Sequence, residues 1–119
     1  MTEINKQVEQ LLMQFQIQNQ QLENVIIQKQ NYLAQKQDIE DAIKELENDC
    51  EVYKIVGPIL IKSETEKLKE ELEERKDDTS MKIKTMEKNE KKLREMIESS
   101  RAKLQEILPT LQTQQPEEN

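Results

Sequence analysis

The sequence lacks most of the residues from which active sites are built. Its 119 residues include no histidine, no tryptophan, one phenylalanine, one glycine and one cysteine. Without histidine, the commonest general base and the commonest metal ligand are missing, and a single glycine rules out a glycine-rich phosphate loop. We therefore predict that the chain is not an enzyme, with no catalytic residue, no cofactor and no metal site.

Cysteine and long apolar runs are also scarce, and their scarcity limits the cellular compartments in which we expect the protein. The single thiol, Cys50, cannot form an intrachain disulfide. No apolar run approaches the roughly 20 residues of a membrane span, and the first residues do not resemble a signal peptide. We expect a reducing compartment, most simply the cytoplasm, and no membrane partner.

The composition is too polar for a large globular core. Hydrophobic residues make up 34% of the chain and charged residues 36%. This balance suits an elongated coiled coil, in which apolar residues form a narrow seam, and disorder is the competing interpretation. The sustained periodicity described below favours the coiled coil.

The net charge of −7 is concentrated in one segment. Residues 38–51 hold seven acidic residues and a single basic one, Lys44. No segment is basic enough to follow a phosphate backbone, which argues against a nucleic-acid-binding coiled coil. The acidic segment is either a solvated face or a surface for a basic partner, and the residues leave both open.

Residues 1–47 carry an apolar seam with the alternating 3–4 spacing of a coiled coil. Ten of its thirteen positions are apolar, and it runs Ile4, Val8, Leu11, Phe15, Gln18, Leu22, Val25, Lys29, Tyr32, Lys36, Ile39, Ile43, Leu46. Glutamine dominates between these positions and combines good helix propensity with no charge. The spacing predicts one long helix over residues 1–47.

Residues 48–63 form the single segment with a strand pattern. Two apolar runs, 52–56 and 59–61, flank Gly57-Pro58, a pair that suits a tight turn. The resulting hairpin would be apolar on both faces, and an isolated two-stranded hairpin is only marginally stable in water. We therefore predict an oligomerisation element that other subunits cover.

A second seam predicts a helix over residues 64–108. It runs Leu68, Leu72, Lys76, Thr79, Ile83, Met86, Glu90, Leu93, Ile97, Ser100, Leu104, Ile107, Leu111. Ser63 and Glu66 form an S-x-x-E capping box, which places the N-cap at Ser63. Because proline disrupts a helix interior, we expect Pro109 to end this helix and residues 109–119 to form a flexible tail. The predicted fold is mainly α: a long antiparallel two-helix coiled coil with one β-hairpin at the turn.

Near both chain ends the apolar stripe is wider than the seam requires. The additional residues are Leu12, Met13, Ile17, Met96, Leu108 and Leu111. A flexible surface that contains methionine suits binding to exposed hydrophobic segments of other proteins. The same residues would also serve to thicken the coil or to pack against a neighbouring one, so both interpretations stand.

The hairpin carries a resemblance to a known family. The pattern E-V-Y-K-x-x-G-x-x-L-I-K, from Glu51 to Lys62 between two long helical segments, resembles prefoldin beta-class subunits. The glutamine-rich first helix, including Gln28-Lys29-Gln30, is similar to that family too. The resemblance extends to Leu108, and the single hairpin fits the beta class rather than the two-hairpin alpha class. The motifs do not separate an archaeal beta subunit from its eukaryotic counterpart.

The resemblance implies an ATP-independent holdase chaperone that passes non-native proteins to a group II chaperonin. It implies a hetero-hexamer of two alpha and four beta subunits, whose hairpins form a double β-barrel. The implied oligomerisation residues are Val52, Tyr53, Ile55, Val56, Ile59, Leu60 and Ile61. The implied client-binding tips of the coiled coil are Ile4, Val8, Leu11, Leu12, Met13, Phe15, Ile97, Leu104, Ile107, Leu108 and Leu111.

The alternative hypothesis is a structural coiled-coil adaptor or tether that joins two partners through its helices. The hairpin discriminates between the two hypotheses, because a tether has no need of a strand pair that is apolar on both faces.

Overall fold

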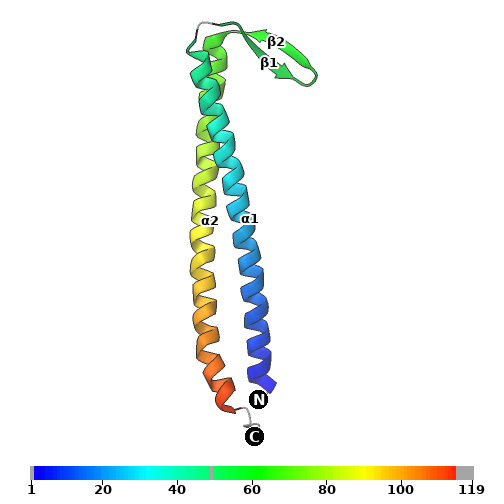
Figure 1. Ribbon diagram of the computed structural model, residues 1–119, viewed down its shortest axis with the longest axis vertical. Coiled ribbons are helices and arrows are strands. Elements are labelled where there is room, and N and C mark those ends of the chain that lie inside the picture. Colours follow the sequence, from blue (N-terminus) through cyan, green and yellow to red (C-terminus); the bar gives the residue numbers. More distant parts are fainter. Residues whose placement is uncertain (1, 49, 115–119) are drawn as a thin grey trace. The chain divides into compact units, whose positions relative to one another are not determined.

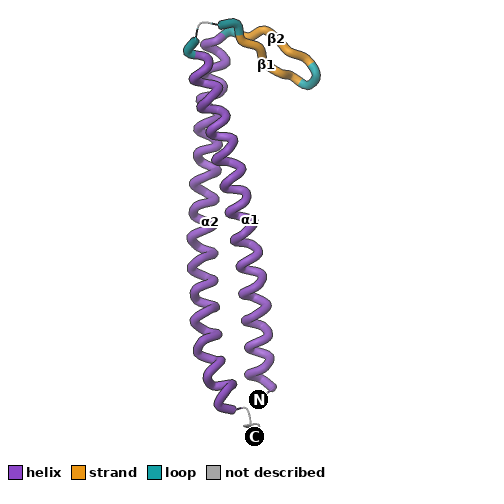
Figure 2. The backbone as a smooth tube through the Cα atoms, viewed as in Figure 1, coloured by secondary structure: helices purple, strands orange, loops and turns teal. Residues whose placement is uncertain are grey.

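The protein consists of two long helices with a β-hairpin between them (Figures 1 and 2). In order they are α1 (Thr2–Leu46), β1 (Val52–Val56), β2 (Ile59–Ser63) and α2 (Thr65–Gln114). This computed structural model describes residues 2–48 and 50–114, without the side chains of Thr2, Ile4 and residues 109–114. The predicted fold, mainly α with an antiparallel hairpin between two long helices, is confirmed.

The chain divides into two compact units, and each contains a stretch of both helices. The terminal unit comprises residues 1–27 and 87–119, and the hairpin unit comprises residues 28–86. Within each unit the two helix stretches run antiparallel, because the chain reverses direction between them (Figure 1). Neither unit forms a globular core, so each depends on the seam between its helices.

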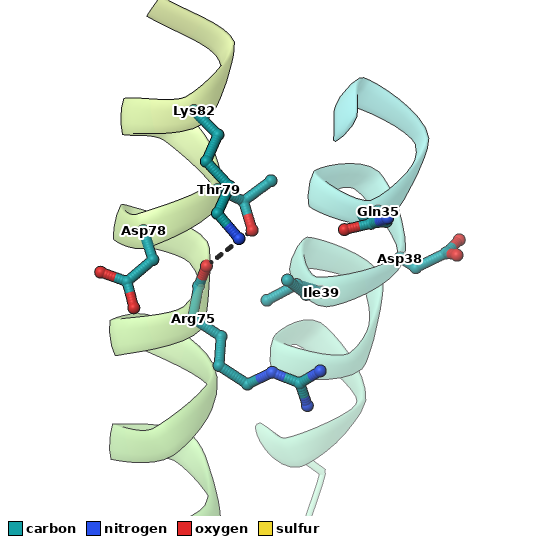
Figure 3. Close-up of a pocket in the computed structure, with 7 residues that line it drawn as sticks. All are labelled: Gln35, Asp38, Ile39, Arg75, Asp78, Thr79 and Lys82. Carbon is teal, nitrogen blue, oxygen red and sulfur yellow. Dashed lines mark hydrogen bonds between the residues drawn. The ribbon is translucent and has the colours of Figure 1, made fainter. Parts of the chain in front are cut away.

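In the hairpin unit, the most buried side chains belong to both seams and to the start of β1. They are Ile43 and Leu46 on α1, Thr79 and Ile83 on α2, and Val52 on β1. In Figure 3, Ile39 points from α1 toward α2. The Nζ atom of Lys82 lies 5.6 Å from the ring centroid of Tyr32, which adds a cation–π contact across the two helices.

The seam of the terminal unit is partly polar. Leu104 is buried, and so are the polar residues Gln18 and Ser100. The half-buried apolar seam residues include Val8, Leu11 and Phe15 on α1. On α2 they are Leu93, Ile97 and Ile107. In both units, every predicted seam position whose side chain is described is buried or half-buried, as the 3–4 spacing predicted.

Short local interactions end α1 and turn the hairpin. The backbone N–H groups of Glu47 and Asn48 donate to the carbonyls of Lys44 and Glu45, at 3.1 and 3.2 Å, which tightens the last turn into 3₁₀ form. Gly57 has a φ of 58°, and Pro58 has the negative φ fixed by its ring. A two-residue loop with a positive φ at its first position is the arrangement of a type II′ hairpin turn.

The predicted N-cap of α2 is wrong by one residue. The helix begins at Thr65, and the N–H of Leu68 donates to the carbonyl of Glu64 at 3.0 Å. Glu64 therefore occupies the N-cap position, since its carbonyl accepts the first helical hydrogen bond. Ser63 is instead the last residue of β2 and pairs with Val52.

The prediction that α2 ends at Pro109 is also wrong. The helix continues through this residue to Gln114. Proline removes one backbone hydrogen bond and crowds the preceding turn, which bends a helix without always ending it. Figure 1 shows such a bend in the last turns of α2, drawn in orange and red. Residues 115–119 of the predicted tail lie outside the described residues.

Candidate assembly hairpin and terminal groove

The strand register assigns each hairpin side chain to one of two faces. Tyr53 pairs with Lys62, Ile55 with Leu60, and Val56 with Ile59. Since side chains alternate along a strand, Tyr53, Ile55, Leu60 and Lys62 share one face. The opposite face carries Val52, Lys54, Val56, Ile59, Ile61 and Ser63. Both faces are therefore mainly apolar, as the sequence indicated.

Six of the seven predicted oligomerisation residues are exposed. They are Tyr53, Ile55, Val56, Ile59, Leu60 and Ile61, and the pair Ile55 and Leu60 is 74% and 65% exposed. The seventh, Val52, is buried and belongs to the core of the hairpin unit. Among the described residues, each strand has a single hydrogen-bonded neighbour, which leaves the outer backbone groups of both strands available for pairing.

Charged contacts join the hairpin to α2 and pair its own polar side chains. The Lys54 ammonium donates a 2.9 Å hydrogen bond to Oε2 of Glu71 on α2. This hydrogen bond, together with the positive charge of Lys54, lowers the pKa of the Glu71 carboxyl below its ordinary value. Glu51, which directly precedes β1, accepts a 3.0 Å hydrogen bond from the Tyr53 hydroxyl, and its carboxylate lies 3.6 Å from the Lys62 ammonium. The charged side chains and the Tyr53 hydroxyl of the hairpin are therefore paired, while most of its apolar side chains face solvent.

The predicted tip residues fall into two groups in the terminal unit. Val8, Leu11, Phe15, Ile97 and Ile107 are half-buried in the seam, and Leu104 is buried. Only Leu12, Met13 and Leu108 are exposed. The side chains of Ile4 and Leu111 lie outside the description. The terminal seam therefore stabilises this unit, and the side chains beside it form the accessible surface.

Three exposed apolar residues line a groove beside that seam. Met13 and Ile17 on α1 and Met96 on α2 border a shallow groove of about 340 Å³. Ile17 and Met96 widen the apolar stripe in the sequence but are not among the implied tip residues. The sequence feature that could identify these two residues is their position next to the seam residues rather than among them.

A second groove, in the hairpin unit, is polar and holds no recognisable catalytic arrangement. It has a volume of about 410 Å³ and lies between α1 and α2 (Figure 3). The side chains of Asp38 and Asp78 point away from the groove, and Thr79 donates a 2.8 Å hydrogen bond to the Arg75 carbonyl. Within residues 2–48 and 50–114, no cluster of three carboxylate or thiolate groups is placed to hold a metal ion. No helix among these residues has an apolar stretch able to cross a membrane.

A two-helix coiled coil that carries an exposed apolar hairpin defines a subunit of a larger assembly. Comparison with known proteins identifies the family, since a family model described as a prefoldin subunit matches residues 9–110. The prefoldin subunit beta of Archaeoglobus fulgidus is 40% identical over 111 residues, which cover 91% of this chain and 96% of that protein. The corresponding subunit of Pyrobaculum islandicum is 35% identical over 114 residues, which cover 93% and 91%.

A solved structure agrees with these relatives. The crystal structure of the prefoldin beta subunit from Thermococcus strain KS-1 has a TM-score of 0.80 and 31% identity, and the alignment covers 92% of this chain and 95% of that one. The chain therefore belongs to the prefoldin subunit family, and the resemblance to the beta class is confirmed. It is a chaperone subunit that assembles with other prefoldin subunits.

Proposed function

We propose that this chain is a subunit of an ATP-independent holdase, which captures non-native proteins at the terminal unit and delivers them to a group II chaperonin. The observation that carries the proposal is the exposed groove bordered by Met13, Ile17 and Met96. Methionine side chains are flexible and polarisable, so they adapt to apolar segments of varied shape. The only glycine, Gly57, lies in the hairpin turn, which leaves no glycine-rich loop to hold a nucleotide.

The proposed assembly is a hetero-hexamer of two alpha-class and four beta-class subunits. Its support is the hairpin, whose exposed faces and free strand edges require neighbours on more than one side. We place the complex in the cytoplasm, where a free and exposed thiol such as that of Cys50 stays reduced.

The test of assembly mixes the full-length chain with an alpha-class prefoldin subunit and measures the mass by light scattering. The expected product is a hexamer that suppresses aggregation of a chemically denatured protein without nucleotide. Delivery is tested by adding a group II chaperonin and following recovery of the native client. A stable homodimer that binds two folded partners and suppresses no aggregation would support the adaptor or tether instead.

The site is tested by replacing the three apolar groove residues with serine. The variant Met13→Ser, Ile17→Ser, Met96→Ser should assemble normally and lose most of its aggregation suppression. A matched control replaces Ile27, Leu33 and Met81, which are also exposed apolar residues on the helices but lie outside this groove. If the control loses as much suppression as the groove variant, the proposed capture site is wrong.

A further inference from the structure

The groove beside the terminal seam is bordered by side-chain amides as well as by apolar groups. Gln10, Gln14, Gln18 and Gln21 on α1 complete its lining with Met13, Ile17 and Met96. The glutamines follow one another at helical spacings of three and four residues, so their amides form a row along one side of α1.

The lining of this groove contains no charged residue, although charged residues make up 36% of the chain. A charged ligand would lose hydration in such a groove without gaining a counter-charge. A purely apolar ligand would satisfy the methionines and the isoleucine but would cover the glutamine amides without pairing them. The groove therefore favours an uncharged ligand that carries both apolar groups and hydrogen-bonding groups.

Two of these amides are available to such a ligand, whereas the buried Gln18 already accepts a hydrogen bond from Ser100. Among the described residues, Gln14 and Gln21 have no hydrogen-bond partner in the protein. Gln20, which lies outside the groove, instead donates to Asn24 at 3.3 Å. Each free glutamine amide presents a carbonyl acceptor and an NH₂ donor, which is the same pair of groups that a peptide bond offers.

We infer that the free amides of Gln14 and Gln21 bind the main chain of an extended, uncharged polypeptide segment, whose apolar side chains contact Met13, Ile17 and Met96. This inference rests on the proposed capture function and names its substrate class. Main-chain recognition is independent of sequence, since every peptide bond carries the same donor and acceptor. It is also insensitive to salt, because no ion pair is involved.

The test uses the full-length chain, alone and in its assembly, and two fluorescent probes. One is an uncharged peptide that alternates leucine and glycine and carries a polyethylene glycol tag. The other has the same side chains, with esters in place of alternate main-chain amides. The groove variant is Gln14→Ala, Gln21→Ala, and the control is Gln16→Ala, Gln20→Ala. All four residues are exposed on α1, and alanine preserves the helix.

We expect the groove variant to bind the amide peptide about fivefold or more weakly than the wild type, which corresponds to the loss of two hydrogen bonds. The ester probe should bind the wild type about as weakly, and the groove variant should not distinguish the two probes. The control variant should match the wild type, and salt should change the wild-type dissociation constant less than twofold.

Several outcomes would overturn the inference. One is a groove variant that binds both probes as tightly as the wild type. Another is a groove variant that still binds the peptide but no longer self-associates, which would make a second copy of the chain the occupant. A third is a groove variant that still binds the peptide but no longer binds phosphatidylcholine vesicles, which would make a lipid surface the occupant. A separate failure is recognised in the serine variant of Met13, Ile17 and Met96: if it still suppresses aggregation, the proposed capture site fails whatever the glutamine result.

Discussion

The Ser100 hydroxyl donates a 2.9 Å hydrogen bond to Oε1 of Gln18 across the seam of the terminal unit, and each residue is only 4% exposed. The two residues lie 82 positions apart in the sequence. A buried polar pair inside an apolar seam stabilises one alignment of two helices, because any shift leaves both groups unpaired in an apolar environment. The pair therefore ties the register of α1 to that of α2 within this unit.

Substitution of Ser100 by alanine should lower the free energy of unfolding by about 1–3 kcal/mol, because Gln18 then keeps a buried acceptor without a donor. The double variant Gln18→Leu, Ser100→Ala should recover most of this loss. Urea unfolding, followed by circular dichroism at a fixed protein concentration, measures the free energy of unfolding of the wild type and of both variants. Equal losses in the single and double variants would contradict the proposed penalty for an unpaired acceptor on Gln18.

The contact between Lys54 and Glu71 makes the position of the hairpin on α2 dependent on pH. Because Lys54 lowers the pKa of Glu71 in the folded state, the contact stabilises the fold above the ordinary glutamate pKa. Its stabilisation is lost as the pH falls through the lowered pKa. We expect the protection factors of the β1 amides, which are corrected for the intrinsic pH dependence of exchange, to fall over that acidic range. Glu71→Gln should show the lower protection already at neutral pH, whereas Glu74→Gln, at an exposed neighbour on α2, should behave as the wild type.

Gly57→Ala should destabilise the hairpin through its backbone alone. The residue has a φ of 58°, and no atom lies within 4 Å of an added Cβ. The cost is therefore that of a left-handed conformation, roughly 1–2 kcal/mol, rather than a steric clash. Gly57→Asn should cost less, because asparagine tolerates this region better. Thermal unfolding of the assembled protein compares the two, and equal losses would contradict the backbone explanation.

A charge placed on the exposed pair of the hairpin should prevent assembly and leave the helices intact. Ile55 and Leu60 face solvent opposite each other, so Ile55→Lys, Leu60→Lys removes no described core contact within the subunit. In an interface the two ammonium groups would be buried without partners. Light scattering should show loss of the assembly at unchanged helical circular dichroism. Met81→Lys, at a residue 67% exposed on α2, is the control and should assemble normally.

Much of this fold follows from local patterns in the sequence. The 3–4 spacing selected the seam residues of both helices, because a helix with one apolar stripe has only one side to bury. The strand segment was equally clear, because β-branched residues on both sides of Gly57-Pro58 match a hairpin. The helix ends were predicted less well. Ser63 met the local rule for an N-cap, but its pairing with Val52 assigned it to β2.

The accessible surface of the terminal unit was only partly predicted. Leu12 and Met13 were among the implied tip residues, whereas Ile17 and Met96 were not, although all four are exposed. Distinguishing the groove from the seam requires knowing how far each helix side chain lies from the partner helix. The heptad pattern gives the direction of a side chain around its own helix but not its depth between two helices.

The sequence by itself determined the two helices, their seams, the hairpin and the family, because these depend on residue spacing and on turn residues that act locally. The tertiary structure decided which apolar residues remain exposed. It also decided that Glu71 accepts a hydrogen bond from Lys54, and that Gln18 accepts one from Ser100. Those contacts join residues far apart in the chain. Their free energies depend on distance and burial, which are set only when the helices and the hairpin have packed together.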